Sequence, residues 1–236
     1  MSARSFLLGT VSLALALAPV GLSGCSGVSG TVAEGPPTRP ELVLDFKTLY
    51  NQNCRACHGE SGQNGPSMDL ANPEFQALVD DNTLRDIISH GLPGTQMPAW
   101  AQQAGGMLTD QQINAIIAGM RKEWARPNAF AGTTPPPYHQ AAGGNAQHGQ
   151  QLYQQRCSSC HQGNERQQPN SPVYLSLVSD DVLRSIIIAG RPDIHQPDIQ
   201  QEGISLQDVT DIITYLHAQR NPDTVSAAPT LRPPRR

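Results

Sequence analysis

The chain has 236 residues, which is enough for one large domain or two small ones. Its formal net charge is −4 and its isoelectric point is near 5.9, so the composition offers no basic surface for nucleic acid. Four of the five cysteines lie in two short motifs and the fifth stands near the N-terminus, which excludes a framework of structural disulfides.

Residues 1–24 have the pattern of an export signal, with a positive charge at Arg4 followed by an apolar run. Pro19 interrupts this run before the roughly 20 apolar residues of a membrane-spanning helix accumulate. The sequence Leu22-Ser23-Gly24-Cys25 resembles the lipobox of bacterial lipoproteins, in which the signal is cut before the cysteine and the cysteine is acylated. We therefore expect lipidation of Cys25 and an anchored protein on the periplasmic side of a bacterial membrane, inner or outer.

Residues 25–41 are rich in Gly, Ser and Pro without an apolar period, and predict a flexible tether. A helix is then expected to lead into Cys54, because four apolar residues recur at helical spacing: Leu42, Phe46, Leu49 and Tyr50.

One motif occurs twice, as Cys54-Arg55-Ala56-Cys57-His58 and as Cys157-Ser158-Ser159-Cys160-His161. Cys-x-x-Cys-His is typical of c-type haem attachment, in which each thiol adds to a vinyl group and the histidine binds the iron. A redox dithiol or half of a zinc site are the alternatives. The repeat predicts two covalently bound haem c groups, attached at Cys54, Cys57, Cys157 and Cys160, with His58 and His161 as iron ligands.

The repeat extends beyond the motifs. Leu84-Arg85-Asp86-Ile87-Ile88 corresponds to Leu183-Arg184-Ser185-Ile186-Ile187, and each stretch is followed by a Gly- and Pro-containing loop. A last amphipathic helix is expected after Thr109 and again after Ser205, with Gln112 completing a capping box in the first copy.

Each half therefore predicts the order helix, haem motif, loop, helix, loop, helix, which is an all-α fold. This order resembles class I cytochrome c over residues 42–125 and 146–220, and the fused pair most resembles the two-domain dihaem cytochromes of the c4 type. We expect cytochrome c domains at 42–126 and 146–220, a Pro/Gly-rich linker at 127–145 and a disordered tail at 221–236.

The resemblance implies a methionine as sixth iron ligand, and Met97 stands in the corresponding loop of the first half. Met68 is too close to the motif for this role, whereas Met107 and Met120 are expected to pack in the interior. The resemblance also implies that a proline carbonyl, here that of Pro66, holds the second nitrogen of His58.

The second half has no methionine in its corresponding loop, and the position that matches Met97 is Gln196. His195 lies one residue earlier and is the expected sixth ligand, with Gln196 or an open iron as alternatives. If His195 binds, the haem at His161 should have the lower reduction potential, and electrons should move from it to the haem at His58.

The resemblance implies an electron carrier rather than an enzyme. We expect single electrons to pass between respiratory or photosynthetic redox partners, with the protein acting as a shuttle or as a subunit of a larger membrane complex. The alternative is a haem enzyme that uses an open second haem for peroxidase-like chemistry or for the chemistry of sulfur compounds or nitrogen oxides.

Overall fold

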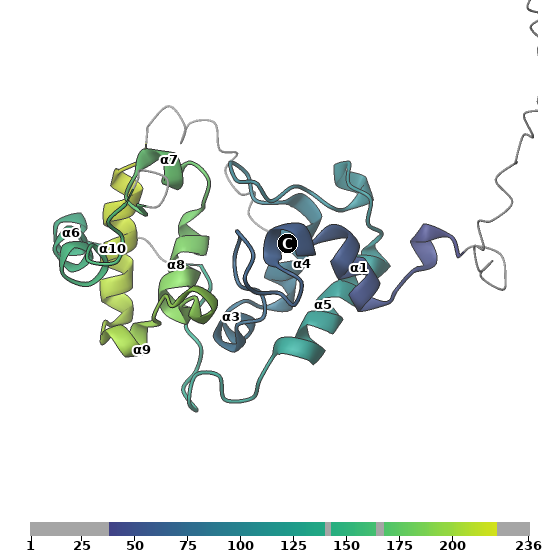
Figure 1. Ribbon diagram of the computed structural model, residues 1–236, viewed down its shortest axis with the longest axis horizontal. Coiled ribbons are helices and arrows are strands. Elements are labelled where there is room, and N and C mark those ends of the chain that lie inside the picture. Colours follow the sequence, from purple (N-terminus) through teal and green to yellow (C-terminus); the bar gives the residue numbers. More distant parts are fainter. Residues whose placement is uncertain (1–37, 140–142, 164–167, 221–236) are drawn as a thin grey trace, which may run out of the picture. The chain divides into compact units, whose positions relative to one another are not determined.

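Helices form the regular secondary structure of the computed structural model, which describes residues 38–139, 143–163 and 168–220 (Figure 1). Those ranges contain no strand, only the isolated bridges Ala101–Leu108 and Arg191–Gln196, so the predicted all-α fold is confirmed. The predictions for the signal at 1–24, for lipidation of Cys25 and for the tail at 221–236 lie outside the described residues. Within them, no helix combines the length and the apolar character needed to cross a bilayer.

The first half, residues 38–139, opens with a short 3-10 turn and contains five α-helices. They are η1 (Pro40–Leu42), α1 (Phe46–Asn53), α2 (Arg55–His58), α3 (Pro73–Leu78), α4 (Asp81–His90), η2 (Gln102–Ala104) and α5 (Asp110–Trp124).

Helix α1 begins later than the apolar spacing predicts. The Asp45 side chain accepts a hydrogen bond from the Thr48 backbone N–H at 2.8 Å and so fixes the first turn at Phe46. Leu42 lies upstream in η1 with 61% of its surface exposed, so its prediction as part of the helical stripe is wrong. Leu49 and Tyr50 are buried as expected.

The second half, residues 143–220, repeats the series with an added 3-10 turn in the loop after α8. It contains α6 (Ala146–Leu152), a π-helical turn η3 (Tyr153–Cys157), α7 (Pro172–Leu175), α8 (Asp180–Ala189), η4 (Pro192–Ile194), α9 (Ile199–Glu202) and α10 (Leu206–Ala218). Helices α5 and α10 both begin at a complete capping box. The box of Thr109 and Gln112 was predicted, and that of Ser205 and Asp208 was missed because aspartate is not the usual partner.

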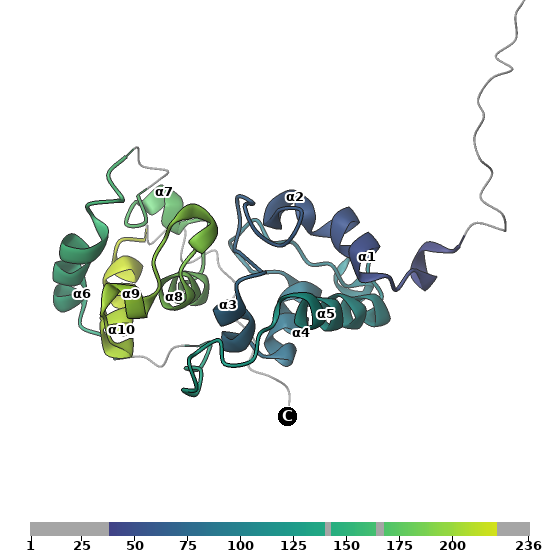
Figure 2. The same cartoon turned by 60° about the horizontal axis from the view of Figure 1, so that its bottom comes forward.

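In each half the helix before the haem motif packs on the last helix (Figures 1 and 2). In the first half Gly119 of α5 receives the Phe46 ring of α1, whose Cγ lies 2.1 Å from where a Cβ on Gly119 would be. Trp124 adds edge-to-face contacts with Phe46 and Tyr50 at centroid distances of 5.5 and 5.2 Å. These contacts attach the segment that leads into the first motif to the core.

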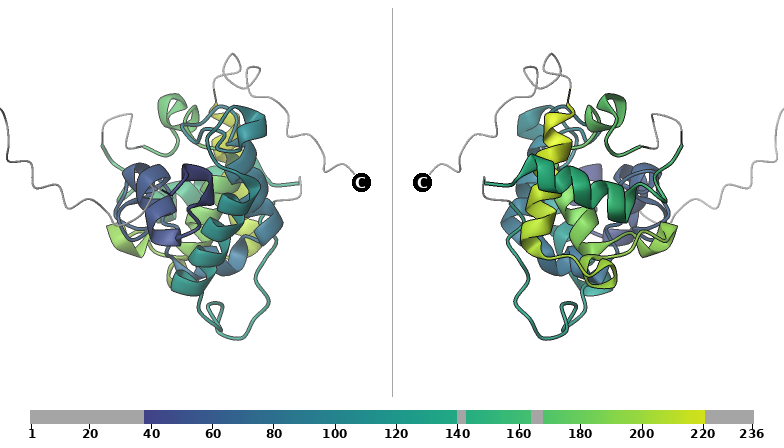
Figure 3. Two further views of the ribbon diagram at one scale, coloured as in Figure 1. Left: turned by 90° about the vertical axis from the view of Figure 1, so that its right-hand side faces the viewer. Right: turned by 90° about the vertical axis from the view of Figure 1, so that its left-hand side faces the viewer.

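The second half makes the same crossing with the glycine on the opposite helix. Helix α6 crosses the yellow helix α10 in the right-hand view of Figure 3. Gly149 of α6 lies against the α10 backbone at Asp211 and Ile212. A Cβ on Gly149 would lie 2.0 Å from the Asp211 carbonyl oxygen. The backbone cannot retreat as a side chain can, so the close approach depends on glycine.

We expect the substitution Gly149→Ala to lower the stability of the haem-loaded protein by about 1–3 kcal/mol, because the added methyl group overpacks the crossing. The better helix propensity of alanine offsets roughly 1 kcal/mol of the steric cost. Thermal unfolding followed by circular dichroism measures the change. Gln150→Ala, at an exposed position of the same helix, is the control and should change stability by less than about 0.5 kcal/mol. An unchanged or raised midpoint for Gly149→Ala would contradict the close crossing.

Candidate functional site

Both Cys-x-x-Cys-His motifs form a single helical turn. In the first, the His58 backbone N–H donates to the Cys54 carbonyl oxygen at 3.0 Å, and in the second the His161 N–H donates to the Cys157 carbonyl at 3.1 Å. Residues three positions apart on a helical turn lie on the same side. The two thiols of each motif are therefore neighbours on one face, and the histidine follows directly after them.

The first cysteine of each motif does not have the lowered pKa of a reactive thiol. Burial, with a smaller contribution from Cys57, raises the pKa of the Cys54 thiol to about 12, and burial together with Glu202 and Cys160 raises that of Cys157 to about 11. Redox-active cysteines instead have lowered pKa values that favour the thiolate. The alternative of a redox dithiol is not supported.

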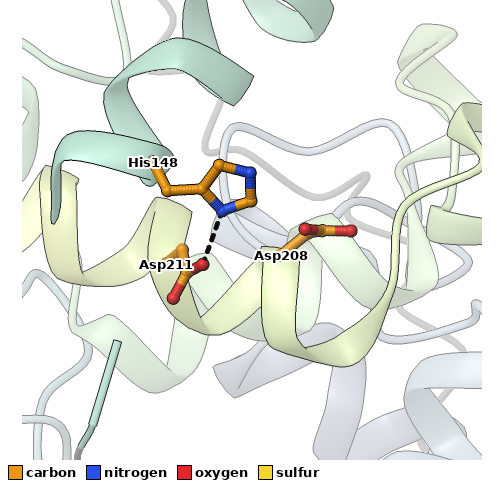
Figure 4. Close-up of side chains that lie close together, drawn as sticks. All are labelled: His148, Asp208 and Asp211. Carbon is orange, nitrogen blue, oxygen red and sulfur yellow. Dashed lines mark hydrogen bonds and ion pairs between the residues drawn. The ribbon is translucent and has the colours of Figure 1, made fainter. Parts of the chain in front are cut away.

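A zinc site is not supported either, because zinc requires its ligand atoms to surround one point. Across residues 38–139, 143–163 and 168–220, one group of three His, Cys, Asp or Glu ligand atoms lies within 4.8 Å of one another, and it contains no cysteine. Its members are His148, Asp208 and Asp211 (Figure 4).

This cluster is explained by the fold. Asp211 accepts hydrogen bonds from His148 Nδ1 and the Asn145 backbone N–H, both at 2.7 Å, and so ties the start of α6 to α10. Asp208 accepts the Ser205 N–H at 2.8 Å in the capping box of α10. Both carboxylates thus have structural roles at the helix crossing.

One ring nitrogen of His58 is hydrogen-bonded to the backbone, and the other is left to bind a metal. Its Nδ1 lies 2.9 Å from the Met68 carbonyl oxygen, which leaves Nε2 as the lone-pair nitrogen. Burial lowers the pKa of His58 against the opposing hydrogen bond to the Met68 carbonyl, and the nearby Arg191 guanidinium adds to the lowering, which favours the neutral imidazole that a metal ligand requires. The prediction that Pro66 supplies this carbonyl is wrong, because the loop after the motif brings Met68 to the ring instead.

Met97 lies in a loop that is closed by hydrogen bonds of its own main chain. The Leu92 N–H donates to the Met97 carbonyl at 3.0 Å, and the Met97 N–H donates to Thr95 Oγ1 at 3.1 Å. Gly91 starts the loop with φ +72°, and a Cβ there would lie 2.6 Å from the Met97 carbonyl oxygen. Met97 is half-buried, and its ligation of iron stays a prediction.

The other two methionines expected to pack differ from each other. Met120 is buried in α5 with 2% of its surface exposed, as expected. Met107 is 70% exposed, so its prediction as a packing residue is wrong.

The matching loop of the second half has the same closure. Gly190 has φ +66°, and the Arg191 N–H donates to the Gln196 carbonyl at 2.8 Å, as that of Leu92 does to Met97. The Gln196 side chain places Oε1 3.1 Å from His161 Nε2. His195, the expected ligand, is exposed and has φ +63°. The structure therefore brings Gln196, rather than His195, to the motif histidine.

Arg191 and Asp193 stabilise this second loop, which sequence reasoning did not single out. The guanidinium donates to both Asp193 carboxylate oxygens, at 2.9 Å through Nε and 2.8 Å through Nη2, and the side chains are only 7% and 1% exposed. Asp193 also accepts the Asn64 N–H at 2.8 Å, and Arg191 donates to the Gly65 carbonyl at 3.2 Å. The pair thus bonds to the loop that follows His58.

The Gln196 loop also borders a cavity of about 520 Å³. Lining residues include Asn72, Glu74, His195, Gln196, Asp198 and Gln201. Burial raises the pKa of Glu74 to about 7, and the Asp198 carboxylate adds to the shift.

Because the folded state holds the Glu74 proton more tightly than the unfolded chain, we expect its contribution to stability to be full below pH 4.5 and lost as the pH rises through about 7. Glu74→Gln should remove this part of the pH dependence and make the variant more stable than wild type at pH 8. Urea unfolding of the haem-loaded protein at pH 5, 6, 7 and 8 measures it. Glu123→Gln, at an exposed site on α5, is the control. Parallel profiles for wild type and Glu74→Gln would contradict the expectation.

Two thiols on one helical turn followed by an imidazole are a donor set that fits a c-type haem. Comparison with known proteins agrees with this fit. Residues 42–118 and 144–216 match the family described as cytochrome c oxidase, cbb3-type, subunit III, and each matched segment contains one motif.

Three curated proteins are similar to parts of the chain. The dihydro-heme d1 dehydrogenase of Pseudomonas aeruginosa is 38% identical over 72 residues, which are 30% of this chain and 14% of that protein. Cytochrome c55X of Paracoccus denitrificans is 34% identical over 76 residues, 31% of this chain and 69% of that protein. Cytochrome c55X of Stutzerimonas stutzeri is 29% identical over 98 residues, 41% of this chain and 79% of that protein.

A solved structure, a chain of the Kuenenia stuttgartiensis reducing HAO-like protein complex, superimposes with a TM-score of 0.46 and 18% identity. The match covers 75% of this chain and 96% of that one.

Proposed function

The chain belongs to the family described as cytochrome c oxidase, cbb3-type, subunit III, and on this premise we propose that it is a dihaem c-type cytochrome that transfers single electrons. The observation that carries the proposal is the repeated helical turn at Cys54–His58 and Cys157–His161. A haem bound at each turn supplies an iron that accepts and releases one electron.

The protein's own residues fix the imidazole and the motif turn that would hold such a centre. The contact of His58 Nδ1 with the Met68 carbonyl fixes the orientation of the imidazole. The Tyr50 hydroxyl donates to the Gly59 carbonyl at 2.9 Å and ties the end of the motif turn to α1. A ligand that does not move between oxidation states keeps reorganisation small, which suits electron transfer.

Membrane attachment through acylated Cys25 is part of this proposal, and it rests on the sequence resemblance to a lipobox. The redox partners are proposed to be respiratory or photosynthetic proteins, reached by a tethered shuttle or within a larger complex on the periplasmic side. Cys25→Ser should release the protein from the membrane fraction of the expressing cells, which separates attachment from haem binding.

Gln196 at the place of Met97 favours a haem enzyme as a second candidate function. A relative is named a dihydro-heme d1 dehydrogenase, and the present chain spans 14% of its length. In this candidate Gln196 would leave the haem at His161 without a strong sixth ligand, and that haem would supply a binding place for a small substrate.

Mass spectrometry and an optical redox titration of the purified protein test the proposal. We expect a mass increment of two haems and two reversible one-electron steps. Met97→Ala should lower the potential of one step only, because thioether ligation raises the potential and axial ligands tune haem over roughly 0.8 V. A single haem, or steps that are not reversible, would overturn the electron-carrier function. Rapid turnover with peroxide would favour the enzyme.

A further inference from the structure

We propose that Gln196 stands at the sixth-ligand place of the second haem, and that this weak carboxamide yields to a small diatomic molecule of the carbon monoxide class. The inference rests on the proposed function, since it requires a haem at Cys157 and Cys160. It makes the two centres different in kind, one capped by Met97 and one that binds ligands.

The backbone hydrogen bonds of the two loops indicate that Gln196 corresponds to Met97. In both loops a glycine of positive φ is followed by a residue whose N–H donates to a carbonyl five residues on, at 3.0 Å for Leu92 and Met97 and 2.8 Å for Arg191 and Gln196. A Cβ on Gly91 would lie 2.6 Å from the Met97 carbonyl, and one on Gly190 would lie 2.7 Å from that of Gln196. The two positions therefore share this hydrogen bond and this close approach to a glycine, although the Met97 N–H bonds to Thr95 Oγ1 and the Gln196 N–H bonds to the Arg191 carbonyl.

The side chain of Gln196 reaches the nitrogen that faces the iron. In a Cys-x-x-Cys-His motif the histidine nitrogen that points away from the motif binds the metal, and His161 Nε2 lies 3.1 Å from Gln196 Oε1. Together these two atoms would offer a haem attached at Cys157 and Cys160 an imidazole from the motif and a carboxamide from the loop. The Gln196 amide nitrogen lies 3.4 Å from the Pro197 carbonyl, which orients the amide and leaves a second N–H.

His195 is held away from this position. Arg191 and Gln196 exchange two backbone hydrogen bonds, at 2.8 and 2.9 Å, and the His195 N–H donates to the Pro192 carbonyl at 3.3 Å. The buried ion pair between the Arg191 and Asp193 side chains also stabilises this turn. A one-residue shift of the loop that put His195 in the place of Gln196 would break the Arg191–Gln196 hydrogen bonds and displace the ion pair. The loop therefore favours Gln196 at this position.

The chemistry of the amide decides the ligand class. A neutral carboxamide oxygen is a hard donor and binds iron more weakly than the imidazole or thioether ligands of electron carriers. Its NH₂ group can donate a hydrogen bond to a ligand on the iron, and hydrogen-bond donors in the distal pocket favour ligand binding. Gln196 also borders the cavity of about 520 Å³, together with Asn72 and Glu74.

Carbon monoxide added to the dithionite-reduced, fully haem-loaded protein tests the inference by absorption spectroscopy. We expect a Soret change that titrates with one of the two haems in wild type. Gln196→Met should abolish it by restoring the thioether cap, and His195→Ala should leave it unchanged. Gln196→Leu, which keeps the volume but lacks the N–H, should still bind carbon monoxide with a shifted C–O stretching frequency in the infrared.

Two outcomes would overturn the inference: two low-spin haems in wild type that do not bind carbon monoxide, or a response that appears only in His195→Ala. The haem content of the same samples, measured as the pyridine haemochrome, separates these outcomes from failure of the proposed function. With two haems per chain the electron-carrier proposal stands even when the assignment of Gln196 fails. With one haem both fail.

Discussion

A variant in which Cys157 and Cys160 are both replaced by alanine is expected to carry one covalently bound haem instead of two. Thioether attachment needs the thiols, and the half-buried His161 alone provides a single coordination bond, which does not survive denaturation. The intact mass should fall by one haem in addition to the change in the protein itself. Haem absorbance per chain should fall by about half in the same preparation.

Two matched variants make this result specific. Cys54→Ala with Cys57→Ala should also retain one haem, but the remaining centre should be the one that responds to carbon monoxide. Ser158→Ala with Ser159→Ala changes the same turn without touching a thiol and should retain both haems. Retention of two haems after loss of Cys157 and Cys160 would show that the second motif is not an attachment site.

The parts of the fold that local chemistry specifies were predicted well from the sequence. The predicted capping box of Thr109 and Gln112 starts α5, and Ile113, Ile116 and Ile117 form the buried face of this predicted amphipathic helix. Where a start depends on a single cap, the apolar spacing misleads. Leu42 continues the period of α1, yet Asp45 starts the helix after it.

The haem motifs were predictable for the same reason, because two thiols and a histidine on one helical turn are a local arrangement. Contacts set by loop paths were not predictable. Pro66 was the expected partner of the His58 ring, and only the path of residues 59–68 brings the Met68 carbonyl there.

The second sixth-ligand position shows the difference most clearly. Alignment of the repeats placed Gln196 opposite Met97, whereas ligand chemistry favoured the adjacent His195. The two-way backbone bridge between Arg191 and Gln196 keeps the register of the alignment, and His195 remains exposed. A charge pair two residues apart, Arg191 and Asp193, was present in the sequence as a signal of a rigid loop.

Loss of the Arg191–Asp193 ion pair is expected to lower the stability of the protein strongly. Arg191→Ala leaves the Asp193 carboxylate, 1% exposed, without its bidentate partner, and we expect a loss of about 3–5 kcal/mol of stability. Denaturant unfolding of the haem-loaded protein at pH 7 measures it. Arg39→Ala is the control, because Arg39 pairs with Glu41 at 3.8 Å with both side chains exposed, and such pairs contribute about 0–1 kcal/mol.

The double variant Arg191→Ala with Asp193→Ala distinguishes an unpaired buried charge from lost packing. It removes the unpaired carboxylate, so it should be more stable than Arg191→Ala alone. The hydrogen bonds from Arg191 outweigh burial and lower the pKa of Asp193 below its ordinary 3.8, so the stability gained from the pair is present above that pH and lost as the pH falls through the lowered value. The difference between wild type and Arg191→Ala should therefore shrink below pH 3.8. A difference that stays constant down to pH 2 would assign the effect to the packing of the arginine side chain rather than to its charge.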